Sequence, residues 1–313
     1  MRLTRWGLGL LLSVALLAGE RAHARPVTYT SIDVPGAMQT VVYGINAAGE
    51  IVGYYKDAAF TDGKRKIHGF ILSGGVFTTV DVPGAAGVEL RGIGPGGDVV
   101  GDYWVAGEAA TATHGFLLRR NGEFVPVEFP LHPYTYPQRI LPNGTILGCY
   151  HENDMLGSMF GMWIRGDKAE AILQSSSMHN GATSDLRLIV GSFTDLGEPA
   201  PRSMWAYVIQ DGVFTRFRLP GSVMSTAWDV TPEGVIVGTY RDASLKTHGF
   251  LLENGTYTTI DFPGAPETRA WGMNANGDVV GIYVDQSGVT HGFLRQDLHE
   301  QRLPDNKERE RQE

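Results

Sequence analysis

The chain has 313 residues, of which 42% are hydrophobic and 19% charged, and its formal net charge is −8. An acidic chain without a basic stripe cannot neutralise a phosphate backbone, so nucleic acid is excluded as a partner. Its single cysteine, Cys149, rules out an intramolecular disulfide, so the fold must depend on burial and backbone pairing. Cys149 lies in an apolar run, which favours a buried thiol over a nucleophile.

The first 24 residues have the pattern of a secretory signal peptide. Arg2 and Arg5 precede an apolar stretch at residues 6–18, and Ala22-His23-Ala24 is a small-x-small cleavage site. The apolar stretch is too short to cross a hydrocarbon layer of about 30 Å, and no later segment is apolar enough to do so. We therefore expect cleavage after Ala24 and a secreted or periplasmic mature chain without a membrane span.

One sequence pattern is repeated six times at intervals of 43 to 48 residues. In each copy a glycine ends a β-branched run and an aromatic residue follows two positions later. The six pairs are Gly53/Tyr55, Gly101/Tyr103, Gly148/Tyr150, Gly191/Phe193, Gly238/Tyr240 and Gly281/Tyr283. A period in this range is typical of propellers, solenoids and arrays, because one repeat cannot bury its apolar face alone.

Each repeat predicts four antiparallel strands, a to d in chain order. The last copy has apolar runs at 269–274, 278–283 and 290–294, and Asn276-Gly277 between the first two predicts a hairpin turn with φ > 0 at both residues. In other copies a fourth run, such as 77–81 or 257–261, follows a further glycine turn and ends in Pro-Gly-Ala or a remnant of it. A four-stranded meander of this kind is typical of a propeller blade.

The two ends of the chain complement each other. Residues 27–33 match strand d, whereas the chain ends after a segment, 291–294, that matches strand c. The first strand should therefore complete the last blade and remove two exposed edges. The sequence predicts a closed, six-bladed, all-β propeller as a single domain over residues 25–295, followed by a charged, disordered tail at 296–313. In the fourth repeat, where residues 174–187 lack the hairpin glycine, strand a is expected near residues 178–184.

Residues that recur in most repeats are interpreted as structural. Four histidines occupy one position of strand c, where Phe160 and Trp205 replace them in the other repeats; they are His68, His114, His248 and His291. We expect them to bond a neighbouring strand or loop. Asp33, Asp81 and Asp261 precede Pro-Gly-Ala and are expected to make Asx-type bonds to nearby backbone. A second recurrent set of aspartates follows strand b: Asp57, Asp195, Asp242 and Asp285. Instead of a structural role, these residues could form a ring of calcium sites, but no dense Asp-x-Asp spacing supports that alternative.

The repeated motifs resemble a known family. Residues 78–85 read TTVDVPGA, residues 44–46 and 51–53 read GIN and IVG, and residues 247–252 read THGFLL. These motifs are similar to those of the bacterial extracellular HAF-family repeat proteins, with glycine in the middle of the His-Ala-Phe signature. The resemblance covers about residues 27–295 and implies export and tandem β-repeats. It implies no established activity, substrate or catalytic residue.

Strand a also carries residues that differ sharply between repeats. At one aligned position stand Tyr43, Arg91, Gln138, Trp228 and Trp271, and two residues earlier stand Val41, Glu89, Tyr136, Thr226 and Arg269. The period of two places both sets on one side of the strand. A ligand pocket could therefore form from aromatic platforms and a few charged groups, namely Tyr43, Glu89, Arg91, Tyr136, Gln138, Trp228, Arg269 and Trp271. The alternative is that these side chains fill the channel, with Glu89 paired to an arginine.

A second candidate cluster lies in the divergent third and fourth repeats. His132, His151, Glu152, Asp154 and His179 should share one face, and imidazole and carboxylate groups together can bind zinc or transfer protons. No compact spacing of metal ligands accompanies them, so ordinary polar loops are the alternative. No metal and no cofactor are predicted.

Two functions follow from these patterns. The first is a non-catalytic binding module that holds an extracellular glycan, small molecule or protein on its loop face and channel mouth. The alternative is a secreted hydrolase or lyase acting on polysaccharide, with Glu89, Arg91 or His151 in acid/base roles. The chain has no serine elbow, phosphate loop, dinucleotide fingerprint or zinc signature, which favours binding.

Overall fold

The computed structural model describes residues 27–58, 66–108, 112–132, 134–151, 159–198 and 203–297. The expected signal peptide at residues 1–24 and the tail from residue 298 onward lie outside these ranges. The last strand continues to Asp297, so the predicted domain end at residue 295 is two residues short. Within the described ranges, no helix is long and apolar enough to cross a membrane.

Twenty-four strands account for nearly all regular structure in these ranges. The first nine are β1 (Val27–Ile32), β2 (Ala37–Ile45), β3 (Ile51–Asp57), β4 (Ile67–Ser73), β5 (Val76–Val80), β6 (Ala85–Ile93), β7 (Val99–Val105), β8 (His114–Leu118) and β9 (Phe124–Val127). The next eight are β10 (Tyr134–Ile140), β11 (Ile146–His151), β12 (Met159–Arg165), β13 (Lys168–Ser175), β14 (Ser177–Ala182), β15 (Leu188–Thr194), β16 (Met204–Gln210) and β17 (Val213–Phe217). The last seven are β18 (Ser222–Val230), β19 (Ile236–Asp242), β20 (Thr247–Glu253), β21 (Thr256–Ile260), β22 (Glu267–Met273), β23 (Val279–Val284) and β24 (Thr290–Asp297).

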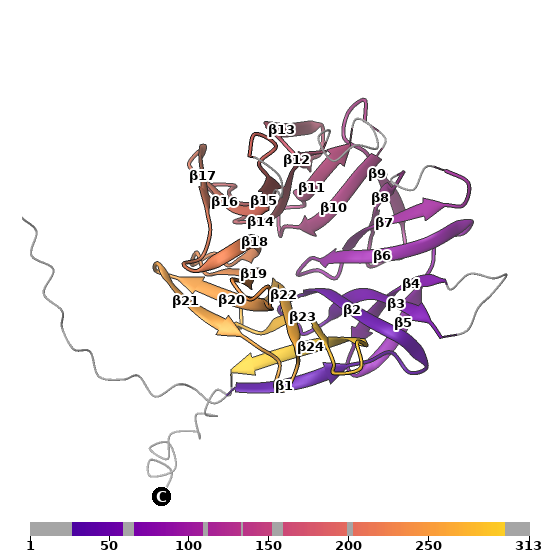
Figure 1. Ribbon diagram of the computed structural model, residues 1–313. Helices are drawn as coiled ribbons and strands as arrows, with labels where there is room; N and C mark the ends of the chain where they lie inside the picture. The colour runs from indigo at the N-terminus through magenta and orange to yellow at the C-terminus, as the bar shows by residue number, and fades with distance from the viewer. Residues whose placement is uncertain are drawn as a thin grey trace, which may run out of the picture. The chain divides into compact units, whose positions relative to one another are not determined.

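The strands form an all-β propeller, in which sheets are arranged around a common axis (Figure 1). Four sheets have the expected four strands: β10–β13, β14–β17, β18–β21, and β22–β24 with β1. The prediction of six four-stranded blades is confirmed for these four sheets only, because β2 to β9 belong to one eight-stranded sheet. A single parallel pair, Ile67 with Gly87, connects β4 to β6. A Cβ atom at Gly87 would lie 2.1 Å from the Trp104 ring, so this position has no room for a side chain.

The predicted pairing of the first and last strands is confirmed. β1 is antiparallel to β24, with a register that runs from Val27 opposite Asp297 to Ile32 opposite Gly292. Ile32 is buried against a core cluster that includes Val42 and Phe70 of the following sheet. The N-terminal strand therefore completes a sheet made otherwise of C-terminal strands and contributes to the core between two sheets.

The hairpin prediction is wrong in its geometry between β22 and β23. Only Gly277 has a positive φ there, 84°, and the loop has three residues, because the Asn274 amide donates to the Asp278 carbonyl. The Asn274 side-chain oxygen accepts the backbone N–H groups of Asn276 and Asp278, which stabilises the wider loop. Two-residue turns with positive φ at both positions occur instead between strands c and d, as at Asn254 (49°) and Gly255 (78°).

The repeated glycine is required by a close backbone approach. A Cβ atom at Gly53 would lie 1.9 Å from the Val41 carbonyl oxygen, and one at Gly281 would lie 1.9 Å from that of Arg269. The other four copies leave equally little room, at most 2.2 Å from an inner-strand carbonyl. No side chain fits at such a distance, so each second strand needs glycine where it crosses the innermost strand.

The recurrent histidines are structural, as predicted. His68 Nδ1 lies 2.7 Å from Asp81 and Nε2 lies 3.2 Å from Asp57, while the ring stacks on Tyr55 at 5.1 Å. His248 and His291 repeat this arrangement with their own tyrosine and two aspartates. The expected Asx bonds of Asp33, Asp81 and Asp261 to backbone are replaced by these contacts with histidine.

The innermost strand of every repeat contains a β-bulge at the same position. The register shifts between Val42/Gly44, Leu90/Gly92, Pro137/Arg139, His179/Gly181, Ala227/Asp229 and Ala270/Gly272. The inserted residues are Tyr43, Arg91, Gln138, Asn180, Trp228 and Trp271. The predicted variable column is therefore the bulge position, and its missing fourth member is Asn180. An inserted residue leaves the ladder, so its backbone groups need partners elsewhere.

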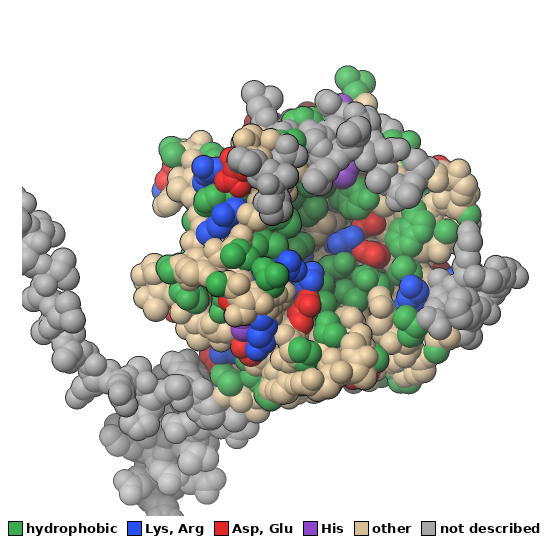
Figure 2. Space-filling view, viewed as in Figure 1, with side chains coloured by type: hydrophobic (Ala, Val, Ile, Leu, Met, Phe, Trp, Pro, Cys, Tyr) green, Lys and Arg blue, Asp and Glu red, His purple; other side chains and the backbone are tan. Residues whose placement is uncertain are grey.

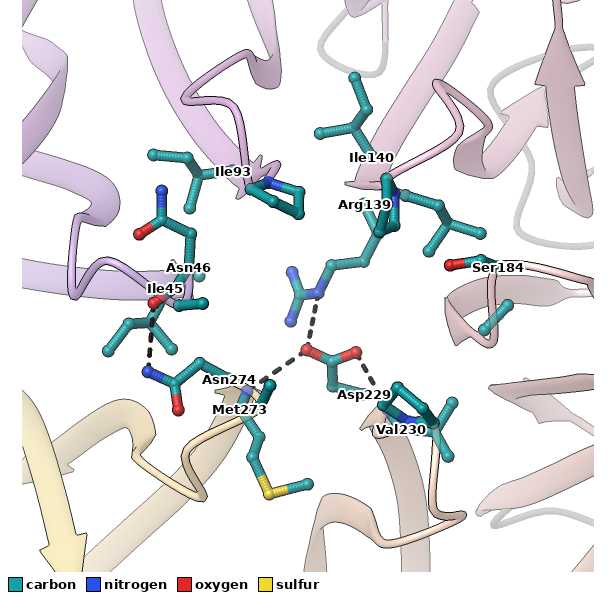
Figure 3. Close-up of a pocket in the computed structure, with 18 of the residues that line it drawn as sticks. Ile45, Asn46, Ile93, Arg139, Ile140, Ser184, Asp229, Val230, Met273 and Asn274 are labelled. Carbon is teal, nitrogen blue, oxygen red and sulfur yellow. Dashed lines mark hydrogen bonds and ion pairs between the residues drawn. The ribbon is translucent and has the colours of Figure 1, made fainter.

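Arg139 supplies these partners at the propeller axis. Its five N–H donors all bond: Nε to Asp229 at 3.2 Å, and the two terminal nitrogens to four bulge carbonyls. Those carbonyls belong to Tyr43 (3.3 Å), Arg91 (2.9 Å), Gln138 (3.0 Å) and Trp271 (2.5 Å). One buried guanidinium thereby connects β2, β6, β10, β18 and β22, and Figure 3 shows its ion pair with Asp229. Burial raises the pKa of Asp229, and the Arg139 charge opposes that shift.

We predict that Arg139→Met will destabilise the fold by about 3–5 kcal/mol, because it leaves a buried carboxylate and several carbonyls without donors. Urea unfolding measures the change. The matched control is Arg187→Met, because Arg187 is 70% exposed in its pair with Asp211, and we expect that change to cost less than about 1 kcal/mol. Equal losses in the two variants would contradict the role assigned to Arg139.

Candidate functional site

Three of the inserted bulge residues, together with Tyr54, form an aromatic group near the axis. Tyr43 stacks on Trp271 with ring centroids 4.9 Å apart, and Trp228 and Tyr54 extend the group at 5.7 Å from Trp271 and 5.9 Å from Tyr43. Val41 belongs to the same packed cluster. Trp271 is buried, whereas Tyr43, Tyr54 and Trp228 are only partly buried, so their rings retain surface that a ligand can contact.

A charged group adjoins the aromatic one. Arg91 lies between two carboxylates, 2.5 Å from Glu89 and 2.9 Å from Asp102, and its guanidinium lies 4.5 Å from the ring centre of Tyr43. β6 places Glu89 opposite Asp102 of β7, which explains why one arginine reaches both. The arginine pairing that the sequence analysis gave as an alternative for Glu89 is therefore present.

Burial and the neighbouring charged groups determine the protonation state of Glu89. Burial, with the Asp102 charge adding to it, raises the pKa of Glu89 to about 7, although Arg91 and a hydrogen bond from Tyr43 act in the opposite direction. Glu89 can therefore either donate or accept a hydrogen bond near neutral pH. Burial also raises the pKa of Tyr54 to about 12, so this phenol remains a neutral donor.

The structure brings five of the eight predicted site residues together: Tyr43, Glu89, Arg91, Trp228 and Trp271. Burial raises the pKa of Tyr136, and the nearby charges of Asp102 and Arg91 have smaller, opposite effects on it. The Tyr136 ring contacts His151. Gln138 is buried, and its side-chain nitrogen has no partner among the described residues. Arg269 pairs with Glu267 at 2.5 Å. Figure 2 shows a hollow in the middle of the propeller, with hydrophobic side chains in it and basic and acidic side chains beside them.

Of the second candidate cluster, the structure describes His132, His151 and His179. His132 stacks near Tyr150 at 4.2 Å, whereas His179 is buried against Tyr207. Glu152 and Asp154 lie outside the described residues. Among the residues that the structure describes, no group of three or more His, Cys, Asp or Glu side chains could hold a metal ion. Cys149 is buried, and burial raises the pKa of its thiol, as expected for an unreactive cysteine.

Sequence reasoning missed Arg139, Asp229 and Asp102. Arg139 and Asp229 occupy the position after the bulge, where the other four repeats have glycine: Gly44, Gly92, Gly181 and Gly272. Asp102 follows the repeated Gly101, where other repeats have Tyr, Cys, Ser, Thr or Ile. A comparison of the six repeats in the sequence could have identified these three residues by their departure from the pattern. Arg139 and Asp229 also line a cavity of about 180 Å³ at the hairpin-turn end of the axis, with Asn46 and Asn274 on its rim (Figure 3).

Comparison with known proteins supports the fold alone. No protein-family model and no curated protein matches the chain. Among solved structures, AofleA from Arthrobotrys oligospora is similar with a TM-score of 0.53 and 12% identity, covering 86% of each chain. The β-propeller domain of the Trilobed protease from Pyrococcus furiosus, described as having an open velcro topology, has a TM-score of 0.52 and 9% identity and covers 86% of this chain and 98% of that domain. A putative TolB from Agrobacterium tumefaciens has a TM-score of 0.52 and 12% identity over 67% of this chain and 74% of its own. The chain is therefore a β-propeller protein.

Buried His179 makes the fold sensitive to acid. Burial lowers its pKa to about 3 from an ordinary value of 6.5, so the unfolded chain binds one more proton than the folded one between these two pH values. The contribution of His179 to the free energy of unfolding is fully present above pH 6.5 and is lost as the pH falls toward 3. Between pH 7 and pH 5 this loss is about 2 kcal/mol. We predict that His179→Gln will reduce this pH dependence in urea unfolding, whereas His132→Gln will leave it unchanged. An identical slope for wild type and His179→Gln would contradict the assignment.

Proposed function

We propose that this protein is an exported, six-bladed propeller of the HAF-repeat kind that binds an extracellular ligand without transforming it. Six blades follow if the eight-stranded sheet is counted as two meanders that share one bridging pair, and the six bulges at one position support this count. Export rests on the signal-peptide pattern of residues 1–24.

The observation that carries the proposal is the contact between the aromatic and the charged group at the axis. Tyr43 stacks on Trp271 and also lies under Arg91, so one side chain belongs to both groups. Flat aromatic faces bind the apolar face of a ring, and a guanidinium between two carboxylates offers donors and acceptors for hydroxyls. Of the three ligand classes expected from the sequence, a glycan fits this combination best.

The alternative, hydrolysis or cleavage of polysaccharide, is favoured by one observation. Glu89 has a pKa of about 7 and lies near a second carboxylate, which is the arrangement that separates acid and base roles. However, Asp102 is 1% exposed and bound to Arg91, so it cannot reach a substrate or a water molecule without breaking that pair. Binding therefore remains the better supported function.

We predict that Trp228→Ala will weaken binding of the best ligand found on a glycan array by about tenfold or more, because it removes a partly buried ring from the aromatic group. Titration calorimetry measures the change. The matched control is Trp205→Ala on β16, whose ring lies under Arg218 rather than at the axis, and it should bind like the wild type. Unchanged affinity in Trp228→Ala would exclude the axial site.

The same ligand distinguishes the two functions. We expect the wild type to release no product from it over many hours. If product does appear and Glu89→Gln abolishes its formation while binding persists, the protein is an enzyme and the binding-only proposal is wrong. Chromatography of the reaction mixture provides this measurement.

A further inference from the structure

A second cavity lies away from the axis, between the sheets β10–β13 and β14–β17. Its volume is about 630 Å³, which is in the range of small-molecule sites. Most of its lining is apolar, and its polar members are few. It is lined by Trp163, Glu170, Ala171, Ile172, Gln174, His179, Leu186, Ile189, Ile209, Gly212 and Phe214. None of these residues belongs to the aromatic or charged group at the axis.

The outer strand that lines the cavity has an irregular pairing with its neighbour. Between β12 and β13 the register jumps from Phe160 opposite Ser175 to Met162 opposite Ala171. The corresponding pairs β4–β5, β16–β17 and β20–β21 have no such shift. Leu186, which lines the cavity, has a positive φ of 59°, a conformation that leucine rarely adopts. Backbone outliers of this kind concentrate at functional sites.

His179 gives the cavity one defined polar atom. The Tyr207 hydroxyl donates its hydrogen to the Met178 carbonyl at 2.7 Å, so its oxygen must accept the hydrogen bond from His179 Nδ1 at 2.6 Å. A neutral imidazole with its proton on Nδ1 has an unprotonated Nε2. This Nε2 makes no hydrogen bond with the described residues, although His179 is 1% exposed and lines the cavity. Nε2 is therefore an acceptor that a ligand hydroxyl in the cavity could use.

We propose that this cavity binds a small, neutral aromatic alcohol whose ring contacts the apolar walls and whose hydroxyl donates to His179 Nε2. The aromatic side chains of Trp163 and Phe214 favour a flat apolar ring. A sugar has more hydroxyls than the few polar side chains of this lining can bond. Anions are disfavoured because Glu170 is the only charged residue of the lining. This site is independent of the ligand proposed at the axis.

The test uses 2-naphthol and its methyl ether, 2-methoxynaphthalene, which differ in the hydroxyl hydrogen. Titration calorimetry on the full-length protein should show binding of 2-naphthol, and about five- to tenfold weaker binding of the ether, as expected for the loss of one hydrogen bond. In His179→Phe the two compounds should bind with equal affinity. Equal affinities in the wild type, or no binding of 2-naphthol up to its solubility limit, would overturn the proposal.

A second variant decides the location even if His179→Phe does not fold. Ala171→Phe fills the cavity from its wall and should abolish 2-naphthol binding, while circular dichroism confirms that the sheet content is retained. The matched control, Lys168→Phe, places the same side chain at an exposed position of β13 that does not line the cavity, and it should bind like the wild type. Undiminished binding in a folded Ala171→Phe variant would place the probe elsewhere and refute this site.

Discussion

The structure depends on how the bulge carbonyls at the axis are satisfied. Each innermost strand inserts one residue, which turns a backbone carbonyl away from its ladder, and an unpaired buried carbonyl is costly. Arg139 bonds four of these carbonyls and Asp229, and therefore uses all five of its donors. A lysine has three donors on one atom and could not reach acceptors on all sides. Arg139 and its partner Asp229 both replace the glycine that follows the bulge in the other four repeats, so the repetition is broken at these two positions.

This requirement also shapes the candidate site. Two of the carbonyls that Arg139 bonds belong to Tyr43 and Trp271, whose rings form the stacked pair. The guanidinium thus fixes the backbone of the residues that would contact a ligand, and a site fixed before binding loses less entropy when it binds.

The repeated residues made the fold predictable, whereas most of the site was not. Gly53 and its equivalents recur in every repeat and the histidine of the stacked His68 group in four, so their pattern is visible in one sequence. The pairing of β1 with β24 follows from the same pattern, because the chain begins with a strand d and ends after a strand c. Contacts such as that between Arg139 and Asp229 join residues 90 positions apart, and their side-chain directions follow from bulges that the strand period conceals. The β13 bulge has no glycine or proline to mark it, so the cavity beside it was not foreseen.

Departures from the repeat in the third and fourth copies are of two kinds. Arg139 replaces a glycine and donates to four backbone carbonyls that the bulges leave unpaired. Its presence is therefore explained by the stability of the fold. Tyr207 replaces the phenylalanine found at this position in four other repeats, and its hydroxyl orients His179 so that Nε2 has no protein donor. Phenylalanine would fill this position without fixing the imidazole. The hydroxyl is instead what leaves Nε2 available as an acceptor to the ligand proposed for the cavity.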